Sequence, residues 1–163
     1  MAGITLSFNS QDALDALLSL ENKLNHAEPM LAEMGEELLD IHEARFKAQI
    51  SPDGIPWKPL QPWYRESKPR NKDKILTLDG PLRNTLRYQI RATELLFGTD
   101  RPYGAAHHFG AIIRPKTAQA LNVQGWLVKK VELPARPWLG VSATDGALLI
   151  EIARNYIQGA LIT

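Results

Sequence analysis

Residues 28–49 read EPMLAEMGEELLDIHEARFKAQ and have the periodicity of an amphipathic helix. Pro29 suits the first turn of such a helix, where its missing N–H removes no hydrogen bond. Apolar and acidic side chains fall on different faces: the apolar face holds Leu31, Met34, Leu38, Ile41 and Phe46, and the mostly solvent-facing set is Glu33, Glu36, Glu37, Asp40 and Glu43. The pattern predicts a long helix that packs against the remainder of the fold along one face.

The chain before this helix predicts a strand and a shorter helix. Residues 4–8 alternate between apolar and polar side chains, as in a short half-buried strand. Ser10 then stands at an N-cap position, and a helix is expected from there to about Asn25. Pro29 has no N–H for a continuing helix, so we expect a break near Ala27. This first helix carries an apolar stripe formed by Leu14, Leu17, Leu18 and Leu24.

Residues 51–74 have a different composition and predict a long loop. Five prolines and two tryptophans replace the helical periodicity between Ser51 and Asp73. Loops of this length inside a compact domain are usually functional or mobile. Large aromatic side chains in the loop either cover the core or anchor a partner surface: they are Trp57, Trp63 and Tyr64. The basic residues near its end predict a flexible solvated tip: Lys68, Arg70, Lys72 and Lys74.

Shorter elements follow this loop. Pro81 suits the first position of a short helix that turns Leu82 and Leu86 inward. Residues 88–93 and 95–99 predict two strands joined by a tight turn. Residues 103–109 predict a helical turn that Gly110 ends in a left-handed conformation.

The last third of the chain predicts a strand and a helix. Residues 127–133 alternate, with Leu127, Val131 and Leu133 on one face. Ser142 and Asp145 have the spacing of a capping box, which would open a final helix with an inward face of Leu148, Leu149, Ile152, Tyr156 and Ile157. The order of elements favours an α+β fold, with helices packed on one face of a mainly antiparallel sheet.

Composition limits the class of protein. The 163 residues, 44% hydrophobic and 23% charged, predict one soluble globular domain over residues 1–163. The absence of cysteine excludes disulfides, thiolate zinc sites, iron–sulfur clusters and cysteine nucleophiles. No run of about 18 apolar residues and no basic region before an apolar run is present, so neither a membrane span nor an export signal is expected.

Charge is unevenly distributed along the chain. The net charge of +1 conceals −6 over residues 1–50, +3 over residues 51–100 and +4 over residues 101–163. Such an axis can steer head-to-tail self-association or attract an anionic partner. The alternative is an ordinary solvated acidic helix face beside basic loops.

His107 and His108, with Asn122 downstream, are the main candidates for chemistry, because paired histidines can bind metal or transfer protons. Hydrolytic metal sites depend on carboxylates, yet Glu132 is the only acid between residues 101 and 143, against six bases. Adjacent side chains also point apart on a helix or strand. A packed or interfacial histidine pair is therefore favoured over a metal-dependent nuclease. Phosphate-binding glycine loops and a nucleophile elbow are missing, so we predict neither an enzyme nor a cofactor.

A nucleic-acid-binding module is the alternative function. Residues 58–91 hold nine bases against three acids and are interleaved with aromatics, as groove or single-strand binding requires. The acidic N-terminal helices and a pI near 8.0 oppose this interpretation, since dedicated binding domains are more basic. A specific nucleic-acid ligand is therefore not expected.

Four motifs in order resemble a known family. They are Trp57-Lys58-Pro59-Leu60, then Ile75-Leu76 with Gly80, Leu82 and Arg83, then Tyr103-x-x-x-His107-x-Phe109-Gly110, and Ala135-Arg136-Pro137-Trp138-Leu139-Gly140 before an Asp-containing helix start. Over most of residues 30–160 the chain resembles the phage virion morphogenesis family, the tail-completion proteins of Mu-like and related tailed phages and prophages. Pro81 and His108 depart from the family pattern, which affects local geometry.

The resemblance implies a non-catalytic structural protein that acts when the tail is finished and joined to the head. It implies a ring-forming oligomer, with the tail tube or terminator and head–tail connector proteins as further partners. Its place would be the tail or neck of the virion, after synthesis in the host bacterial cytoplasm. No cofactor is implied.

The interaction residues expected on this basis are Trp57, Tyr103, His107, Phe109, Arg136, Pro137, Trp138 and Leu139. Pro137 holds Arg136 in an extended conformation, from which its guanidinium could bind a carboxylate on a neighbouring subunit. Trp138 and Leu139 could fill the core or the subunit contact. The alternative is that Arg136 caps a helix within its own chain and Trp138 belongs to the core.

Overall fold

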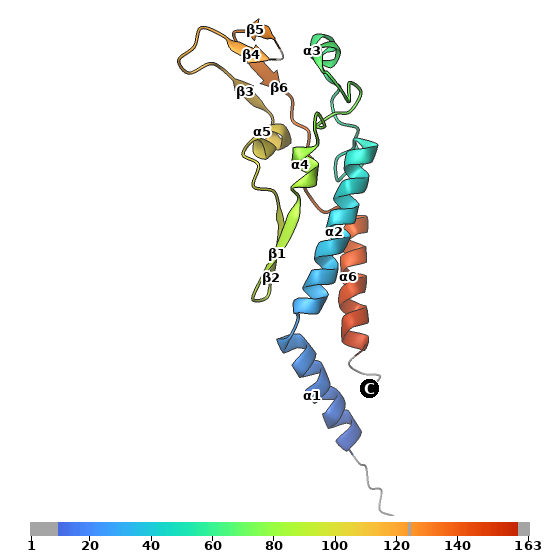
Figure 1. Cartoon of the computed structure of the whole chain (residues 1–163). Helices are drawn as coiled ribbons and strands as arrows, with labels where there is room; N and C mark the ends of the chain where they lie inside the picture. The colour runs from blue at the N-terminus through green and yellow to red at the C-terminus, as the bar shows by residue number, and fades with distance from the viewer. Residues whose placement is uncertain (1–9, 124, 160–163) are drawn as a thin grey trace, which may run out of the picture.

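The computed structural model describes residues 10–123 and 125–159. Within this part of the chain the molecule is elongated along its longest helix, with the first helix at one end and short strands at the other (Figure 1). The strand expected at residues 4–8 lies outside the described residues. None of the described helices is long and apolar enough to cross a membrane.

Three helices form the long axis: α1 (Gln11–Asn25), α2 (Glu28–Ala48) and α6 (Ala143–Gln158). The predicted boundaries of α1 and α2 and the break near Ala27 are confirmed. Ser10 occupies the N-cap position of α1, but its side chain makes no capping hydrogen bond. α2 packs against α6 and against the first pair of strands (Figure 1).

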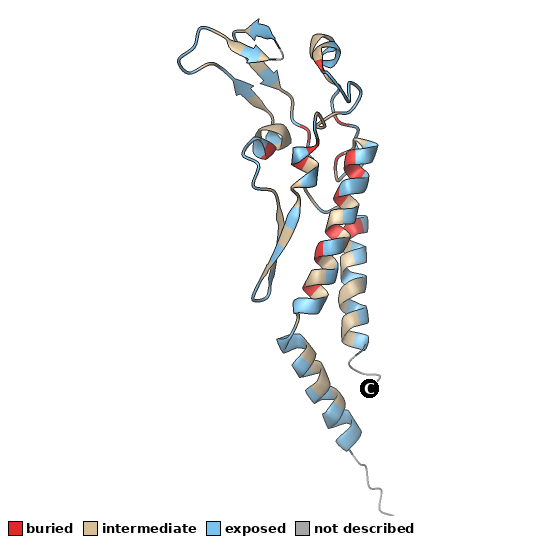
Figure 2. Cartoon of the chain, viewed as in Figure 1, coloured by how far each residue is buried: buried red, intermediate tan, exposed pale blue. Residues whose placement is uncertain are grey.

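The buried face of α2 agrees with the prediction and extends beyond it. Leu31, Leu38 and Phe46 are buried, and Met34 and Ile41 are half-buried. Three polar or small residues share this face: Gly35, His42 and Arg45. Burial follows one side of α2 along its length (Figure 2).

The α+β class is confirmed, and the described strands form three separate antiparallel pairs rather than one sheet. The pairs are β1 (Arg87–Arg91) with β2 (Glu94–Gly98), β3 (Ala111–Ile113) with β6 (Val131–Leu133), and β4 (Leu121–Val123) with β5 (Trp126–Val128). The hairpin predicted over residues 88–99 is confirmed with shifted ends. Of the described strands, β1 and β2 are the ones that pack closely against α2. The other two pairs lie beyond the C-terminal end of α2 (Figure 1).

The single strand predicted over residues 127–133 is wrong. Its two ends, β5 and β6, pair with different strands, and the chain bends between them at Lys129 and Lys130. Leu127 is 74% exposed instead of sharing an inward face with Val131 and Leu133.

Short helices interrupt the connections. The loop expected over residues 51–74 contains α3 (Pro62–Ser67), and Pro81 opens α4 (Pro81–Asn84) as predicted. The helical turn α5 (Tyr103–Phe109) is confirmed. Gly110 follows it at φ 81° and ψ 159°, which is a positive φ outside the left-handed helical region. A Cβ at Gly110 would lie 2.9 Å from the Leu133 carbonyl oxygen.

The capping box that opens α6 is confirmed. The Ser142 hydroxyl accepts from the Asp145 N–H at 3.1 Å, and the Asp145 carboxylate accepts from the Ser142 N–H at 2.6 Å. Along α6 the residues expected inward are half-buried, with one exception. Leu148 is 41% exposed, because α2 covers only part of this face.

The core lies where α2, α4 and the proline-rich loop meet. Phe46, Trp57, Leu82 and Trp138 form its buried centre, with Ile75, Leu76, Leu86 and Leu139 packed around it. The Phe46 and Trp57 rings meet edge to face with centroids 5.3 Å apart, a geometry that aromatic quadrupoles favour. Segments far apart in the sequence are therefore joined at one end of α2.

Candidate functional site

The two most distinctive motifs of the sequence meet in a junction of backbone and side-chain hydrogen bonds. The Trp138 indole N–H donates to the Gly104 carbonyl at 3.0 Å, and the Arg136 backbone N–H donates to the His107 carbonyl at 2.9 Å. A Cβ at Gly104 would lie 3.2 Å from Trp138 Cζ2. Glycine at this position therefore lets α5 approach the tryptophan ring closely.

Arg136 connects this junction to the proline-rich loop. Its guanidinium donates from Nε to the Lys58 carbonyl at 2.7 Å and from Nη2 to the Pro59 carbonyl at 3.0 Å. The Trp57 indole N–H in turn donates to the Pro137 carbonyl at 2.8 Å. Arg136 is only 4% exposed. The expectation that its guanidinium reaches outward to a carboxylate is therefore wrong. The alternative, that Arg136 caps a helix of its own chain, is also wrong, because its guanidinium donates to carbonyls of the loop.

The histidines of α5 face the same junction. His108 Nδ1 lies 3.3 Å and 3.4 Å from the backbone N–H groups of Trp138 and Leu139, so this nitrogen accepts and carries no proton. His107 Nδ1 is buried without a hydrogen-bond partner among the described residues. Burial lowers the pKa of both imidazoles, and the Arg136 charge further lowers the pKa of His107. Both rings are therefore neutral near pH 7 and face protein atoms.

A second polar cluster, which the sequence interpretation missed, joins α2 to α6. The Arg45 guanidinium donates to the Asp145 carboxylate and to the Gly140 carbonyl. Burial alone would raise the pKa of Asp145, but hydrogen bonds from Ser142 and the Arg45 charge outweigh it and lower that pKa. The signal for Arg45 was available, because it falls on the apolar face of α2 beside Phe46.

His42 lies beside this cluster and is the most buried polar side chain. It is 1% exposed, its Nδ1 lies 2.7 Å from the Leu38 carbonyl, and its Nε2 accepts from the Gly140 N–H at 3.4 Å. Burial lowers the pKa of His42, although the hydrogen bond to Leu38 opposes that shift. The neutral ring therefore connects α2 to the segment that precedes α6.

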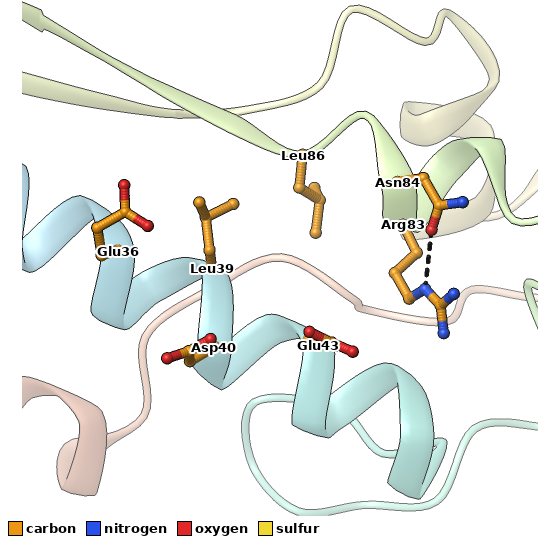
Figure 3. A pocket seen from close by; sticks show the side chains of 7 residues that line it. All are labelled: Glu36, Leu39, Asp40, Glu43, Arg83, Asn84 and Leu86. Carbon is orange, nitrogen blue, oxygen red and sulfur yellow. Dashed lines mark hydrogen bonds between the residues drawn. The ribbon is translucent and has the colours of Figure 1, made fainter.

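A depression of about 370 Å³ lies between α2 and the region around α4 (Figure 3). Glu36, Asp40 and Glu43 line its α2 side, and Arg83 lines the other. Glu36 accepts from the Tyr88 hydroxyl at 2.8 Å, and the Lys47 ammonium pairs with Glu43 at 2.9 Å. Across residues 10–123 and 125–159, no three His, Asp or Glu side chains are placed to hold a metal ion.

Most of the bases in residues 58–91 have acceptors within the chain. Lys68, expected in a flexible solvated tip, is 2% exposed and its ammonium donates to the carbonyls of Asn71, Lys74 and Thr77. Burial lowers the pKa of Lys68. Other bases of this segment pair with carboxylates: Arg65 with Asp73, Arg70 with Asp79, and Arg87 with Asp100. The nucleic-acid interpretation stays a prediction, with fewer unpaired cations to support it.

Most of the exposed large apolar side chains among the described residues fall into two sets, and the others are scattered: Ile55, Leu96, Tyr103, Val141, Leu148 and Ile150. The first set, called here the α1 stripe, consists of Leu14, Leu17, Leu18 and Leu24, which are 50–61% exposed. The second lies on and beside residues 111–133, called here the arm, which contains β3 to β6. Its exposed members are Phe109, Ile112, Ile113, Trp126 and Leu127. The two sets are at opposite ends of the molecule (Figure 1).

Comparison with known proteins identifies the family. The model of the phage virion morphogenesis family matches residues 8–158. The chain belongs to this family. It is 25% identical over 150 residues to the Mu-like prophage FluMu G protein 2 of Haemophilus influenzae, covering 92% of each chain. No solved structure matches.

Membership of the phage virion morphogenesis family gives the chain a role in phage structure or morphogenesis. The expected interaction residues fall into two groups in this family member. Trp57, Arg136 and Trp138 are buried, and Pro137 and Leu139 lie against them in the junction. Tyr103 and Phe109 are 39% and 77% exposed, while His107 is half-buried. Direct contact of any of these residues with a partner stays a prediction.

The exposed apolar surfaces of this virion morphogenesis protein were only partly anticipated. The α1 stripe was visible in the sequence as helical periodicity, but its exposure was not. The apolar residues of the arm gave no signal, because short strands with alternating side chains read as half-buried.

Proposed function

We propose that the chain is a non-catalytic structural component of the virion that completes the phage tail and prepares it for joining to the head. It acts as an oligomer of identical copies, in the tail or neck. Its other partners are the tail tube or terminator protein and the head–tail connector. It is made in the host bacterial cytoplasm and assembles there.

One observation carries this proposal beyond family membership. Trp57, Arg136 and Trp138 of the recognised motifs form a buried junction, whereas most of the exposed large apolar side chains lie in the α1 stripe and the arm, at the two ends of an elongated molecule (Figure 1). Exposed apolar patches of this kind are typical of surfaces that bind other proteins. The His108 imidazole accepts from the Trp138 backbone N–H, and the His107 carbonyl accepts from the Arg136 backbone N–H. These contacts within one chain support a structural role for this motif.

The test is a phage or prophage whose gene for this chain is inactivated. We expect separate filled heads and tails in electron micrographs of the lysate, with few infectious particles. Purified protein added to that lysate should restore joined particles and plaques. Normal particles without the protein would overturn the proposal, and so would a lysate that contains neither heads nor tails.

Catalysis is tested in the same complementation assay. The variant His107→Gln keeps a polar side chain but removes the imidazole, so it should restore particle joining if the histidine is structural. Loss of joining together with an unchanged fold, oligomeric state and binding to tails would contradict a non-catalytic role.

A further inference from the structure

Within the part of the chain that the structure describes, the hydrogen bonds between α1 and α6 lie at one end of α1. Near its C-terminus the Lys23 ammonium donates to the Tyr156 carbonyl at 3.2 Å, and the Tyr156 hydroxyl donates to the His26 carbonyl at 2.6 Å. No residue of α1 is buried. The helix projects beyond α2 and α6 (Figures 1 and 2).

The α1 stripe has the properties of a face that another surface covers. Its four leucines follow helical spacing and are 50–61% exposed. An isolated helix of this length is marginal in water, and most helical stability in proteins comes from packing an amphipathic face. A regular α1 with an uncovered stripe therefore indicates a partner.

The arm supplies a matching apolar surface. Leu127 is 74% exposed, Ile112 63% and Trp126 56%, and Phe109 beside the arm is 77% exposed. α2 alone separates the two ends of the molecule by roughly 30 Å, from a rise of about 1.5 Å per residue. The stripe and the arm of one copy therefore cannot meet.

The arm and α1 carry opposite net charges, which favours contact between them. α1 contains Asp12, Asp15 and Glu21 against Lys23, which gives −2. The arm contains Arg114, Lys116, Lys129 and Lys130 against Glu132, which gives +3. Among the described residues, Arg114, Lys116 and Lys129 form no ion pair, whereas Lys130 pairs with Glu132. Two α1 helices would bring like charges together.

We propose that the α1 stripe of one copy docks onto the arm of a second copy. The contact joins two different surfaces, so each copy still offers one free surface of each kind. Such a heterologous contact closes into a ring if the rotation between copies permits and otherwise continues as a filament. This inference rests on the proposed function and names the contact through which its oligomer forms.

The experiment uses the full chain with matched variants of exposed residues. Leu17→Gln with Leu18→Gln removes the centre of the stripe, and Ile112→Gln with Leu127→Gln removes the centre of the arm. Ile150→Gln is the control, because Ile150 is 54% exposed on α6 outside both surfaces. Circular dichroism verifies that each variant folds, and sedimentation and light scattering measure mass against concentration.

We expect the wild type and the Ile150→Gln variant to form oligomers that added salt weakens. Each double variant should raise the dissociation constant at least about tenfold, as expected when apolar anchors are lost. Mixing the two double variants should give one-to-one pairs and nothing larger, because together they retain one intact stripe and one intact arm.

Several outcomes would overturn this contact. An arm variant that assembles as the wild type does, beside a monomeric stripe variant, would show that α1 pairs with α1 or with a surface of the second copy other than the arm. A wild type that stays monomeric at every concentration would also overturn it. If a phage with the inactivated gene still fails to join tails to heads in that case, the proposed function stands and only the proposed contact is refuted. If the contact forms but the phage needs no such protein, the proposed function falls instead.

Discussion

Arg136 connects two segments that lie almost 80 residues apart, because its guanidinium binds two consecutive loop carbonyls. A guanidinium presents its donors in a rigid planar fork, which an ammonium cannot reproduce. Arg136 is buried and pairs with no carboxylate of the described residues, so its role depends on hydrogen bonds to the loop. The arginine of the A-R-P-W-L-G motif thereby fixes the position of the W-K-P-L motif.

Replacement of Arg136 tests this role. Arg136→Met should lower the free energy of unfolding by about 2–4 kcal/mol, because two carbonyls lose their donor in a buried site. The free energy of unfolding of Arg136→Lys should lie between those of Arg136→Met and the wild type, since the lysine can retain one hydrogen bond. Arg154→Met, on the exposed surface of α6, is the control and should change stability by less than about 0.5 kcal/mol. Urea unfolding measures all three, and an Arg136→Met protein as stable as its control would contradict the assignment.

Three buried or half-buried histidines make stability depend on pH. Burial lowers the pKa of His42, His107 and His108 in the folded chain. The unfolded chain therefore binds protons below about pH 6.5, where the folded chain does not yet bind them. Stability should be constant above that pH and should fall as the pH drops toward the lowered values.

His107→Leu tests this dependence, because His107 Nδ1 is buried and no described residue forms a hydrogen bond with it. Between pH 7.5 and 5.5 the variant should lose less free energy of unfolding than the wild type. The number of protons taken up on unfolding should fall by at most about one, because the variant lacks one imidazole. Between pH 7.5 and 8.5 the two proteins should show the same slope. Urea unfolding across this range is the measurement, and parallel curves below pH 6.5 would contradict the assignment.

At the scale of elements, α2 packs closely on the β1–β2 hairpin through a glycine. A Cβ at Gly35 would lie 2.5–2.7 Å from ring carbons of Tyr88, whose hydroxyl donates to Glu36. Glycine inside a helix costs up to about 1 kcal/mol relative to alanine. Here the close approach of the tyrosine ring outweighs helix propensity.

Gly35→Ala should therefore destabilise the chain by about 1–3 kcal/mol, the range for overpacking. Gly146→Ala in α6 is the matched control, because the nearest atom to its Cβ is Val141 Cγ1 at 3.9 Å. That variant should gain roughly 0.5–1 kcal/mol from helix propensity. Thermal unfolding compares the two, and shifts of the same sign would refute the packing argument.

At the scale of the whole molecule, stability is concentrated around the core at one end of α2. Phe46, Trp57, Leu82 and Trp138 gather there, whereas α1 has no buried residue and the arm has short strands. Regions with few buried contacts open locally at low free energy. The two ends that carry exposed apolar surface are thus also the least stabilised parts of a single copy.

Hydrogen exchange should show this difference. In dilute protein the amides of α1 should exchange much faster than those of α2. Protection of α1 and of the arm should rise together as concentration promotes assembly, while α2 stays protected throughout. Exchange followed by mass spectrometry across concentration makes the measurement, and an α1 already as protected as α2 in the monomer would contradict it.

The sequence by itself determined the elements with strong local signals. The limits of α1 and α2, the hairpin of β1 and β2, α5 and the capping box of α6 follow from periodicity, proline and capping residues. The family could also be recognised from the sequence, because each of its motifs is a short run of neighbouring residues. Such signals depend on a few neighbouring residues, so they can be recognised in a single sequence without knowledge of the tertiary structure.

Only the tertiary structure decided which polar groups are buried and which apolar groups are exposed. Lys68 and Arg136 look like surface cations in the sequence, yet both are buried. Lys68 donates to carbonyls of the loop residues that follow it, and Arg136 donates to carbonyls of a segment almost 80 residues away. Arg45 is buried where Asp145 of α6 meets the apolar face of α2. The leucines of α1 look like core residues but remain 50–61% exposed, because among the described residues α6 meets α1 only in a small contact and leaves this stripe uncovered. Burial depends on where distant segments meet, and periodicity along the chain does not encode that meeting.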